Sequence, residues 1–243
     1  MTSLLIPVAP LSKTKSRLRD CFSNEMLKDL TICLFKDLGV KLQKVQNIFN
    51  EILVYCYNSE ILEIAEGYGL IGIKEELTTP QKSFNQVITD LNSIAVRKFN
   101  AQQTLISFLD LILIAPQNFF ESEALLKKHP IVVCPAIHSA GISIFGRNPP
   151  EVISSFCFSD PNNTSLLSLY IEAKKLGIDI ELYDSFRSGF DVDLKQDLVL
   201  AYKYLKLFNL KNTETYAFLK KNLKLTLQNN NSNNNRDFQI IKK

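Results

Sequence analysis

The chain has 243 residues, 46% of them hydrophobic and 22% charged, a composition typical of a globular protein that can bury a core. The net charge is only +3 and the basic residues are dispersed, which argues against a dedicated nucleic-acid-binding protein. Five cysteines without a C-x-x-C pair argue against a disulfide framework and indicate reduced thiols.

Apolar runs alternate with amphipathic patterns along most of the chain. The apolar runs predict buried strands at residues 4–8, 51–57, 70–74, 104–109, 131–135, 141–145 and 178–183. The amphipathic patterns predict helices from an N-cap at Ser23 to about residue 42, at 60–68, from Pro80 to 94, and at 116–128, 164–176 and 195–207. The alternation predicts a three-layer α/β/α fold with a mostly parallel sheet.

No shift in composition divides the chain, so we expect a single domain over residues 1–210. Residues 211–227 are expected to form a peripheral helix, and residues 228–243, which include the Asn-rich tract 229–235, a disordered tail. There is no signal-peptide pattern, and the most apolar run, 105–115, is too short to span a bilayer. We therefore expect a cytoplasmic protein with neither a membrane nor a nucleic-acid partner.

A basic loop follows the first predicted strand and contains Lys13, Lys15, Arg17 and Arg19. In open α/β sheets ligands bind beyond the carboxyl ends of the strands. Lysine and arginine at such an end suit phosphate groups, since arginine offers a bidentate fork and lysine a compact charge. A solvated basic loop without a ligand is the simpler interpretation of this segment alone.

Three aspartates lie at the ends of two other predicted strands. Asp110 ends an apolar run, and a buried charge there must be paired or bind a metal, unless Asp110 merely caps the next segment. Asp191 and Asp193 lie two residues apart, so an extended backbone would point both carboxylates to one side. The alternative for this pair is an acidic helix start. Together the three carboxylates would suit Mg²⁺ bound to phosphates.

Other catalytic patterns are missing from the sequence. The P-loop motif G-x-x-x-x-G-K-[ST] does not occur, and no serine has the context of a nucleophile elbow. The cysteines lack metal-ligand spacing, and the two histidines stand alone in the sequence.

Several short motifs, in this order, resemble those of the 2-phospho-L-lactate guanylyltransferase family, of which the chain would be a divergent member. They run from about residue 4 to 205 and are clearest at the two ends. The motifs are Ile6-Pro7-Val8, Lys15-Ser16-Arg17-Leu18, Phe84-Asn85-Gln86-Val87, Asp110-Leu111, Tyr183-Asp184-Ser185-Phe186 and Gly189-Phe190-Asp191-Val192-Asp193.

This resemblance implies a nucleotidyltransferase fold of the glycosyltransferase-A type. It implies transfer of a guanylyl group from GTP to 2-phospho-L-lactate or phosphoenolpyruvate, with release of pyrophosphate, in coenzyme F-420 biosynthesis. Handover of the product to the next enzyme of that pathway follows, and a homodimer is compatible with the sequence. The residues carried over are Lys15 and Arg17 as catalytic, Asn85, Lys13 and Ser165 as nucleotide-binding, and Asp110, Asp191 and Asp193 as Mg²⁺ ligands.

The sequence departs from the family pattern at several places. Ala9 stands where family members often have lysine, and residues 138–142 replace a glycine-rich turn. Ile112 stands where proline is usual. These changes leave two alternatives open, a non-catalytic relative that binds nucleotide or a partner, and a nucleotidyltransferase with a different acceptor.

Overall fold

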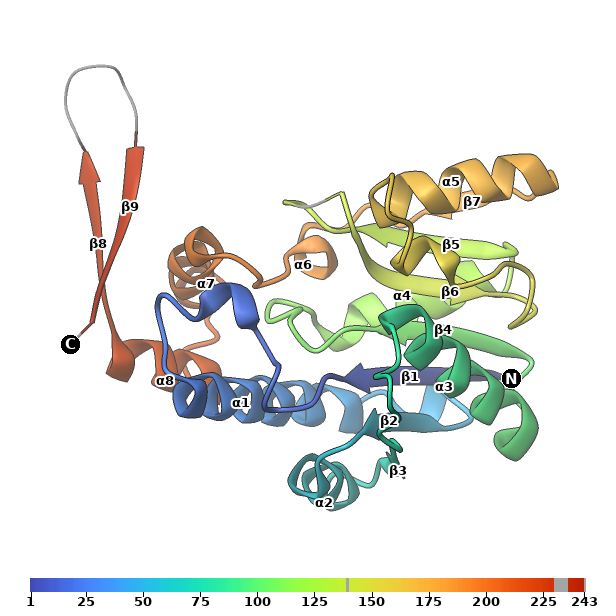
Figure 1. Cartoon of the computed structure of the whole chain (residues 1–243), viewed down its shortest axis with the longest axis horizontal. Coiled ribbons are helices and arrows are strands. Elements are labelled where there is room, and N and C mark those ends of the chain that lie inside the picture. Colours follow the sequence, from blue (N-terminus) through green and yellow to red (C-terminus); the bar gives the residue numbers. More distant parts are fainter. Residues whose placement is uncertain (139, 230–235, 243) are drawn as a thin grey trace.

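The computed structural model describes residues 1–138, 140–229 and 236–242 (Figure 1). Its main sheet has seven strands in the order β3-β2-β1-β4-β6-β5-β7. Strand β6 runs antiparallel to β4 and β5, and the other pairs are parallel. The strands are β1 (Thr2–Val8), β2 (Ile52–Cys56), β3 (Ile71–Lys74), β4 (Gln103–Ser107), β5 (Ile131–Pro135), β6 (Ile142–Arg147) and β7 (Ile180–Leu182). The predicted, mostly parallel sheet is confirmed.

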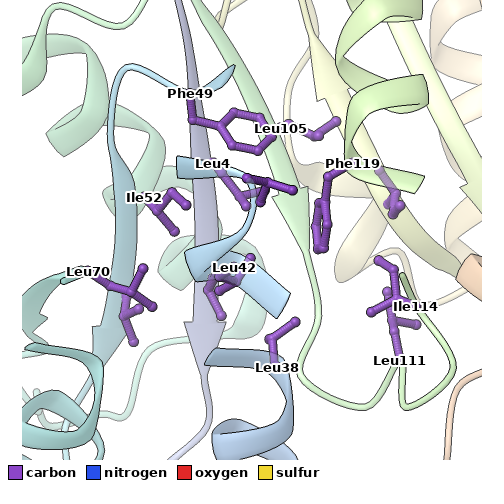
Figure 2. Packing of buried hydrophobic residues seen from close by; sticks show 14 of the residues in the cluster. Leu4, Leu38, Leu42, Phe49, Ile52, Leu70, Leu105, Leu111, Ile114 and Phe119 are labelled. Atoms are coloured by element: carbon purple, nitrogen blue, oxygen red, sulfur yellow. The ribbon is translucent and has the colours of Figure 1, made fainter. Parts of the chain in front are cut away.

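Helices cover both faces of this sheet, because successive side chains of its buried strands point to opposite sides. Leu4, on β1, packs with helices α1 (Asn24–Gln43), α2 (Ser59–Gly67) and α4 (Pro116–Leu126) (Figure 2). Its neighbour Leu5 packs on the other face with α3 (Phe84–Phe99) and α5 (Ser165–Leu176). The fold therefore has the three layers that the sequence predicts.

A further apolar cluster lies beyond the carboxyl end of β1. The first half of α1 packs there against α7 (Lys195–Leu207) and α8 (Glu214–Asn222) (Figure 1). Phe190 and Val192, from the segment between the short helix α6 (Phe186–Gly189) and α7, are buried in the same cluster. The cluster thus fixes the segment that carries Asp191 and Asp193.

Helix α3 begins later than the sequence predicted. Its first residue is Phe84 rather than Pro80, and Ser83 is its N-cap. The Gln86 amide donates to Ser83 Oγ at 3.3 Å, and the Ser83 amide donates to Gln86 Oε1 at 2.7 Å. This reciprocal capping box satisfies two backbone donors at the helix start. A start at Pro80 would put Lys82 at the third position, where it could not complete such a box.

The C-terminal segment differs most from the expectation. The helix expected over residues 211–227 is confined to α8, whose first turn is held by Asp37 on α1 through the amides of Glu214 and Thr215. Residues 223–229 instead form β8, which pairs antiparallel with β9 (Arg236–Lys242). This hairpin replaces part of the expected disordered tail. Apolar residues at alternate positions, 223, 225 and 227, have the period of a strand.

The Asn-rich residues 230–235 lie outside the described residues. Within the described ranges, no helix combines the length and the hydropathy that crossing a bilayer requires.

Gly39 gives a test of the packing of α1. A Cβ at this position would lie 2.4 Å from the Tyr68 ring and 2.9 Å from the ring's first atom, Cγ, so the whole ring would have to move. We expect Gly39→Ala to lower the free energy of unfolding by about 1–3 kcal/mol through overpacking, although alanine favours helices. Urea unfolding measures this change.

Gly67→Ala is the matched control, because a Cβ on this helical glycine meets nothing within 4 Å. Gly67→Ala should leave stability unchanged or raise it by less than about 1 kcal/mol. If Gly39→Ala and Gly67→Ala changed the free energy of unfolding by the same amount, the packing of Tyr68 against α1 would be contradicted.

Candidate active site

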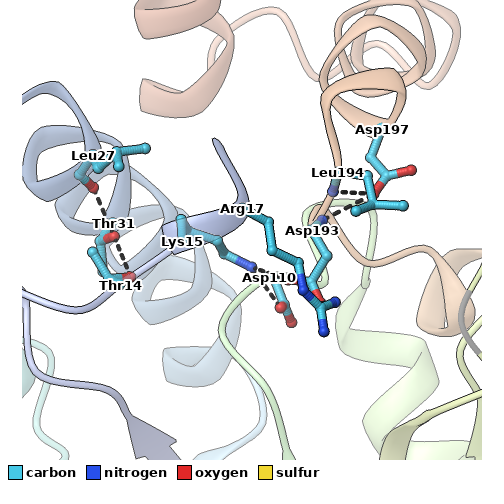
Figure 3. A network of polar contacts seen from close by, with 9 residues as sticks. All are labelled: Thr14, Lys15, Arg17, Leu27, Thr31, Asp110, Asp193, Leu194 and Asp197. Carbon is cyan, nitrogen blue, oxygen red and sulfur yellow. Dashed lines mark hydrogen bonds and ion pairs between the residues drawn. The ribbon is translucent and has the colours of Figure 1, made fainter. Parts of the chain in front are cut away.

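The basic loop after β1 is fastened at several points. Thr14 Oγ1 lies 2.9 Å from Thr31 Oγ1 on α1, and Thr31 donates to the Leu27 carbonyl at 2.8 Å (Figure 3). Earlier in the loop, the Leu11 amide donates to Asn58 Oδ1 at 2.9 Å. Lys15 itself has left-handed backbone angles, φ 47° and ψ 39°, just before the short 3₁₀ turn at Ser16–Leu18. The anchored loop directs the Lys15 side chain inward.

Lys15 joins two of the predicted aspartates. Its Nζ lies 2.6 Å from Asp110 Oδ2 and 2.9 Å from Asp193 Oδ1, and only 9% of its side chain is exposed (Figure 3). Arg17, with 65% of its side chain exposed, places Nη1 3.5 Å from Asp193 Oδ2. Segments that follow β1, follow β4 and precede α7 therefore meet at one ammonium group.

Two partly buried cations hold the segment that follows Asp110. Lys41 Nζ, on α1, donates to the Ile112 carbonyl at 2.9 Å. Arg187 Nε, on α6, donates to the Leu113 carbonyl at 2.7 Å. Burial is the main cause that lowers the pKa of Lys41 to about 8; the Asp37 charge opposes this shift and the Arg187 charge adds to it. These contacts fix the backbone beyond Asp110 and so limit where its carboxylate can lie.

Asp197 holds the backbone at Asp193. Its Oδ2 accepts from the amides of Asp193 at 2.9 Å and Leu194 at 2.6 Å (Figure 3). Only 1% of the Asp197 side chain is exposed, and His138 Nδ1 lies 2.7 Å from its other oxygen. The sequence analysis missed Asp197, although an aspartate in the first turn of a predicted helix is a recognised capping signal.

Asp191 is the most isolated carboxylate of the site. It is 8% exposed, and among the described residues its Oδ1 has no hydrogen-bond partner. Burial, together with the negative charges of Asp110 and Asp193, raises the pKa of Asp191 to about 6. Val192 points the other way into the apolar cluster, as the predicted alternation requires.

Lys15 and Asp193 stabilise each other's charged forms. Burial alone would raise the pKa of Asp193, but the charges of Lys15 and Arg17 lower it below its ordinary value. Burial would likewise lower the pKa of Lys15, but Asp110 and Asp193 raise it. The ion pair is therefore formed at neutral pH.

These side chains line a cleft of about 550 Å³. One wall is aromatic, since the ring centroids of Phe84, Phe108 and Phe158 lie between 5.4 and 5.9 Å apart. The first residue of α5, Ser165, and the two residues before it line another side of the cleft. The sequence analysis did not find the aromatic wall, because Phe84, Phe108 and Phe158 come from three separate segments.

Six of the eight predicted site residues line this cleft, namely Lys15, Arg17, Asp110, Ser165, Asp191 and Asp193. The other two, Lys13 and Asn85, are not among the described residues that line it. Lys13 pairs with Gln81, and Asn85 Oδ1 lies 3.5 Å from Thr89 Oγ1 within α3. Of the turn at 138–142, Gly141 and Ile142 line the cleft, and Ser139 lies outside the described residues.

In the described part of the chain, no group of three or more His, Cys, Asp or Glu side chains is arranged to hold a metal ion. The cause is visible in the geometry, since the Lys15 ammonium lies between Asp110 and Asp193. The all-oxygen donor set of the three aspartates nevertheless fits the preference of Mg²⁺, and Asp191 Oδ1 needs a partner.

Comparison with known proteins places the chain in a family. The sequence profile described as "Guanylyl transferase CofC like" matches residues 2–242. The chain belongs to this family. It is 24% identical over 196 residues to a 2-phospho-L-lactate guanylyltransferase of Methanocaldococcus sp. (strain FS406-22), covering 80% of this chain and 78% of that one. It is 22% identical over 230 residues to the enzyme of that name from Methanosphaera stadtmanae, covering 93% and 92%. This CofC-like chain is therefore a divergent guanylyltransferase.

Solved structures agree on the fold. A protein described as a nucleotide-diphospho-sugar transferase from Desulfovibrio desulfuricans G20 superposes with a TM-score of 0.69 at 13% identity, covering 90% of this chain and 94% of that one. A cytidylyltransferase from Leptospira borgpetersenii gives a TM-score of 0.56 at 13% identity, covering 94% and 99%. At these identities the likeness shows the nucleotide-diphospho-sugar transferase fold alone, as the sequence predicted.

The pKa of Asp191 predicts a gain in stability when its charge is removed. Near neutral pH Asp191 is ionised in the folded and the unfolded protein, and burial disfavours that form only in the folded one. Without divalent cations, Asp191→Asn should therefore raise the free energy of unfolding by roughly 1–2 kcal/mol. The gain should shrink as the pH falls below about 6 and should vanish below the unfolded-chain pKa of 3.8, where Asp191 is protonated in both states.

Asp193→Asn should act in the opposite direction. The lowered pKa of Asp193 stabilises the folded protein above the pKa of the unfolded chain, and this contribution is lost as the pH falls. Urea unfolding at several pH values measures both variants. If both substitutions changed the free energy of unfolding in the same direction near neutral pH, the charges assigned to Asp191 and Asp193 would be contradicted.

Proposed function

We propose that this CofC-like guanylyltransferase transfers the guanylyl group of GTP to 2-phospho-L-lactate or phosphoenolpyruvate. Pyrophosphate leaves, and the product passes to the next enzyme of coenzyme F-420 biosynthesis. The observation that carries the proposal is the cleft in which Asp110, Asp191 and Asp193 meet Lys15 and Arg17. The carboxylates suit a divalent cation, and the lysine and arginine suit the phosphates that the cation would accompany.

Mg²⁺ is the cation that we propose for the site. Asp110, Asp191 and Asp193 would hold it through carboxylate oxygens, and Asp191 Oδ1 is free among the described residues to bind it. When bound, the ion would neutralise negative charge that develops on the phosphates.

The chain's own groups have distinct roles in the proposed reaction. Lys15 and Arg17 bind the phosphates of GTP, and Ser165 offers a hydroxyl at the start of α5. The cleft holds an acceptor phosphate oxygen in line with the α-phosphorus, where a new P–O bond forms. The bond from the α-phosphorus to the bridging oxygen breaks, and its electrons leave with pyrophosphate.

The aromatic wall suits the base of the nucleotide. The rings of Phe84, Phe108 and Phe158 form an edge-to-face cluster, and Phe84 is 45% exposed. An exposed aromatic face stacks on a base without selecting which one. Asn85 follows Phe84 on α3 but is not among the described residues that line the cleft, so its proposed contact with the nucleotide requires a change in this first turn. The roles of Asn85 and Lys13 in nucleotide binding stay predictions.

A different phospho-acid acceptor is the second candidate. Gly141 and Ile142 line the cleft, and they belong to the turn that departs from the family pattern. A changed turn at the cleft would alter the groups that contact the acceptor. The residues proposed to bind Mg²⁺ and the phosphates of GTP are kept.

Pyrophosphate release tests the proposed reaction. With GTP and Mg²⁺ we expect release on addition of 2-phospho-L-lactate or phosphoenolpyruvate, with the product trapped by the next enzyme of the pathway. Asp191→Ala should lower the rate by roughly two orders of magnitude or more, because a carboxylate of the reaction centre is lost. Asp179→Asn, an exposed aspartate outside this cleft, is the control and should keep the rate. Binding of GTP without pyrophosphate release from any phospho-acid would refute the proposal.

A further inference from the structure

Lys15 lies where a cation between two carboxylates would lie. Its ammonium is within hydrogen-bonding distance of one oxygen of Asp110 and one of Asp193, and its side chain is almost fully buried (Figure 3). Taking a lysine out of water is costly unless opposite charges and hydrogen bonds compensate. The two carboxylates provide that compensation, and Lys15 in turn reduces the repulsion between them.

The backbone conformation at Lys15 directs its side chain toward the two aspartates. Its φ of 47° is in the left-handed region, which L-residues other than glycine, asparagine and aspartate seldom adopt. The preceding residue, Thr14, is buried and bonded to Thr31 on α1. A residue held in an unfavourable conformation by its surroundings indicates a functional constraint on that residue.

The Lys15 ammonium competes with a divalent cation for these two carboxylates. Lys15 takes one oxygen of each aspartate, and Arg17 lies 3.5 Å from the second oxygen of Asp193. A metal ion bound by both aspartates would compete with Lys15 and Arg17 for these carboxylates and would meet the positive charge of Lys15 at close range. Phosphates offer Lys15 an alternative anionic partner, and they enter the same cleft in the proposed reaction.

We propose that Lys15 is a removable counter-ion, which excludes divalent cations from Asp110 and Asp193 until a nucleotide arrives. The phosphates of the nucleotide then take over the ammonium, and the carboxylates become free for the cation. Cation binding thereby depends on nucleotide binding. This proposal rests on the proposed function only in taking a nucleoside triphosphate as the ligand.

Mn²⁺ is the probe for the test, because free Mn²⁺ is measured directly by electron paramagnetic resonance. Without nucleotide, Lys15→Met should bind Mn²⁺ at least about tenfold more tightly than the unaltered protein, since the competing charge is gone. Lys13→Met is the matched control. It removes the same charge from the same loop, but Lys13 contacts Gln81 rather than the aspartates. Its affinity for Mn²⁺ should change by less than about threefold.

A double variant tests whether the gain in Mn²⁺ affinity depends on Asp193. Lys15→Met combined with Asp193→Asn removes the unpaired carboxylate along with the lysine and should lose most of the gain in Mn²⁺ affinity. In Lys15→Met, saturating Mn²⁺ should also raise the unfolding temperature more than it does in the unaltered protein. Equal Mn²⁺ affinities of the unaltered protein and Lys15→Met would overturn the proposal, and so would an equal gain in Lys13→Met.

Nucleotide additions separate this proposal from the proposed function. After subtraction of the Mn²⁺ that GTP binds in protein-free solution, GTP should tighten Mn²⁺ binding to the unaltered protein by at least about tenfold and have a smaller effect on Lys15→Met. If another nucleoside triphosphate has this effect and GTP does not, the role of Lys15 is supported and the guanylyl specificity is refuted. If no triphosphate tightens Mn²⁺ binding, the removable counter-ion is refuted.

Discussion

The ion pair of Lys15 with Asp110 and Asp193 is the interaction on which the cleft depends. It joins three segments that are far apart in the sequence, and without it two carboxylates would repel each other at close range. Each segment is also anchored, by Thr31 at the basic loop, by Lys41 and Arg187 after Asp110, and by Asp197 at the start of α7. The electrostatic centre is thus supported by a rigid frame, as a preorganised site requires.

The arrangement of the sheet explains why these segments meet. Parallel strands β1 and β4 are neighbours, so the segments that follow them leave the sheet at the same edge. The apolar cluster beyond this edge, which includes Phe190 and Val192, brings the segment before α7 to the same place. Acidic groups therefore gather at one end of the cleft, and an aromatic wall and the start of α5 complete it. A nucleotidyltransferase needs one part of its cleft for the phosphates of the nucleotide and another part for the base.

Local patterns allowed much of this to be predicted from the sequence. Apolar runs alternating with amphipathic patterns predicted the sheet and its helices. Separately, the alternation of side chains along an extended segment predicted that Asp191 and Asp193 lie on one side with Val192 opposite. Features that depend on contacts between distant segments could not be predicted in this way. They include the aromatic wall of Phe84, Phe108 and Phe158 and the pairing of Lys13 with Gln81. The C-terminal hairpin was missed although its alternating leucines are visible, because the Asn-rich tract suggested disorder.

A crystal structure with GTP and Mg²⁺ tests the central claim most directly. The account predicts Mg²⁺ bound by oxygens of Asp110, Asp191 and Asp193 at about 2.0–2.1 Å, with the Lys15 ammonium moved onto the phosphates. A bound nucleotide with Lys15 still between Asp110 and Asp193, and the metal held elsewhere, would contradict it.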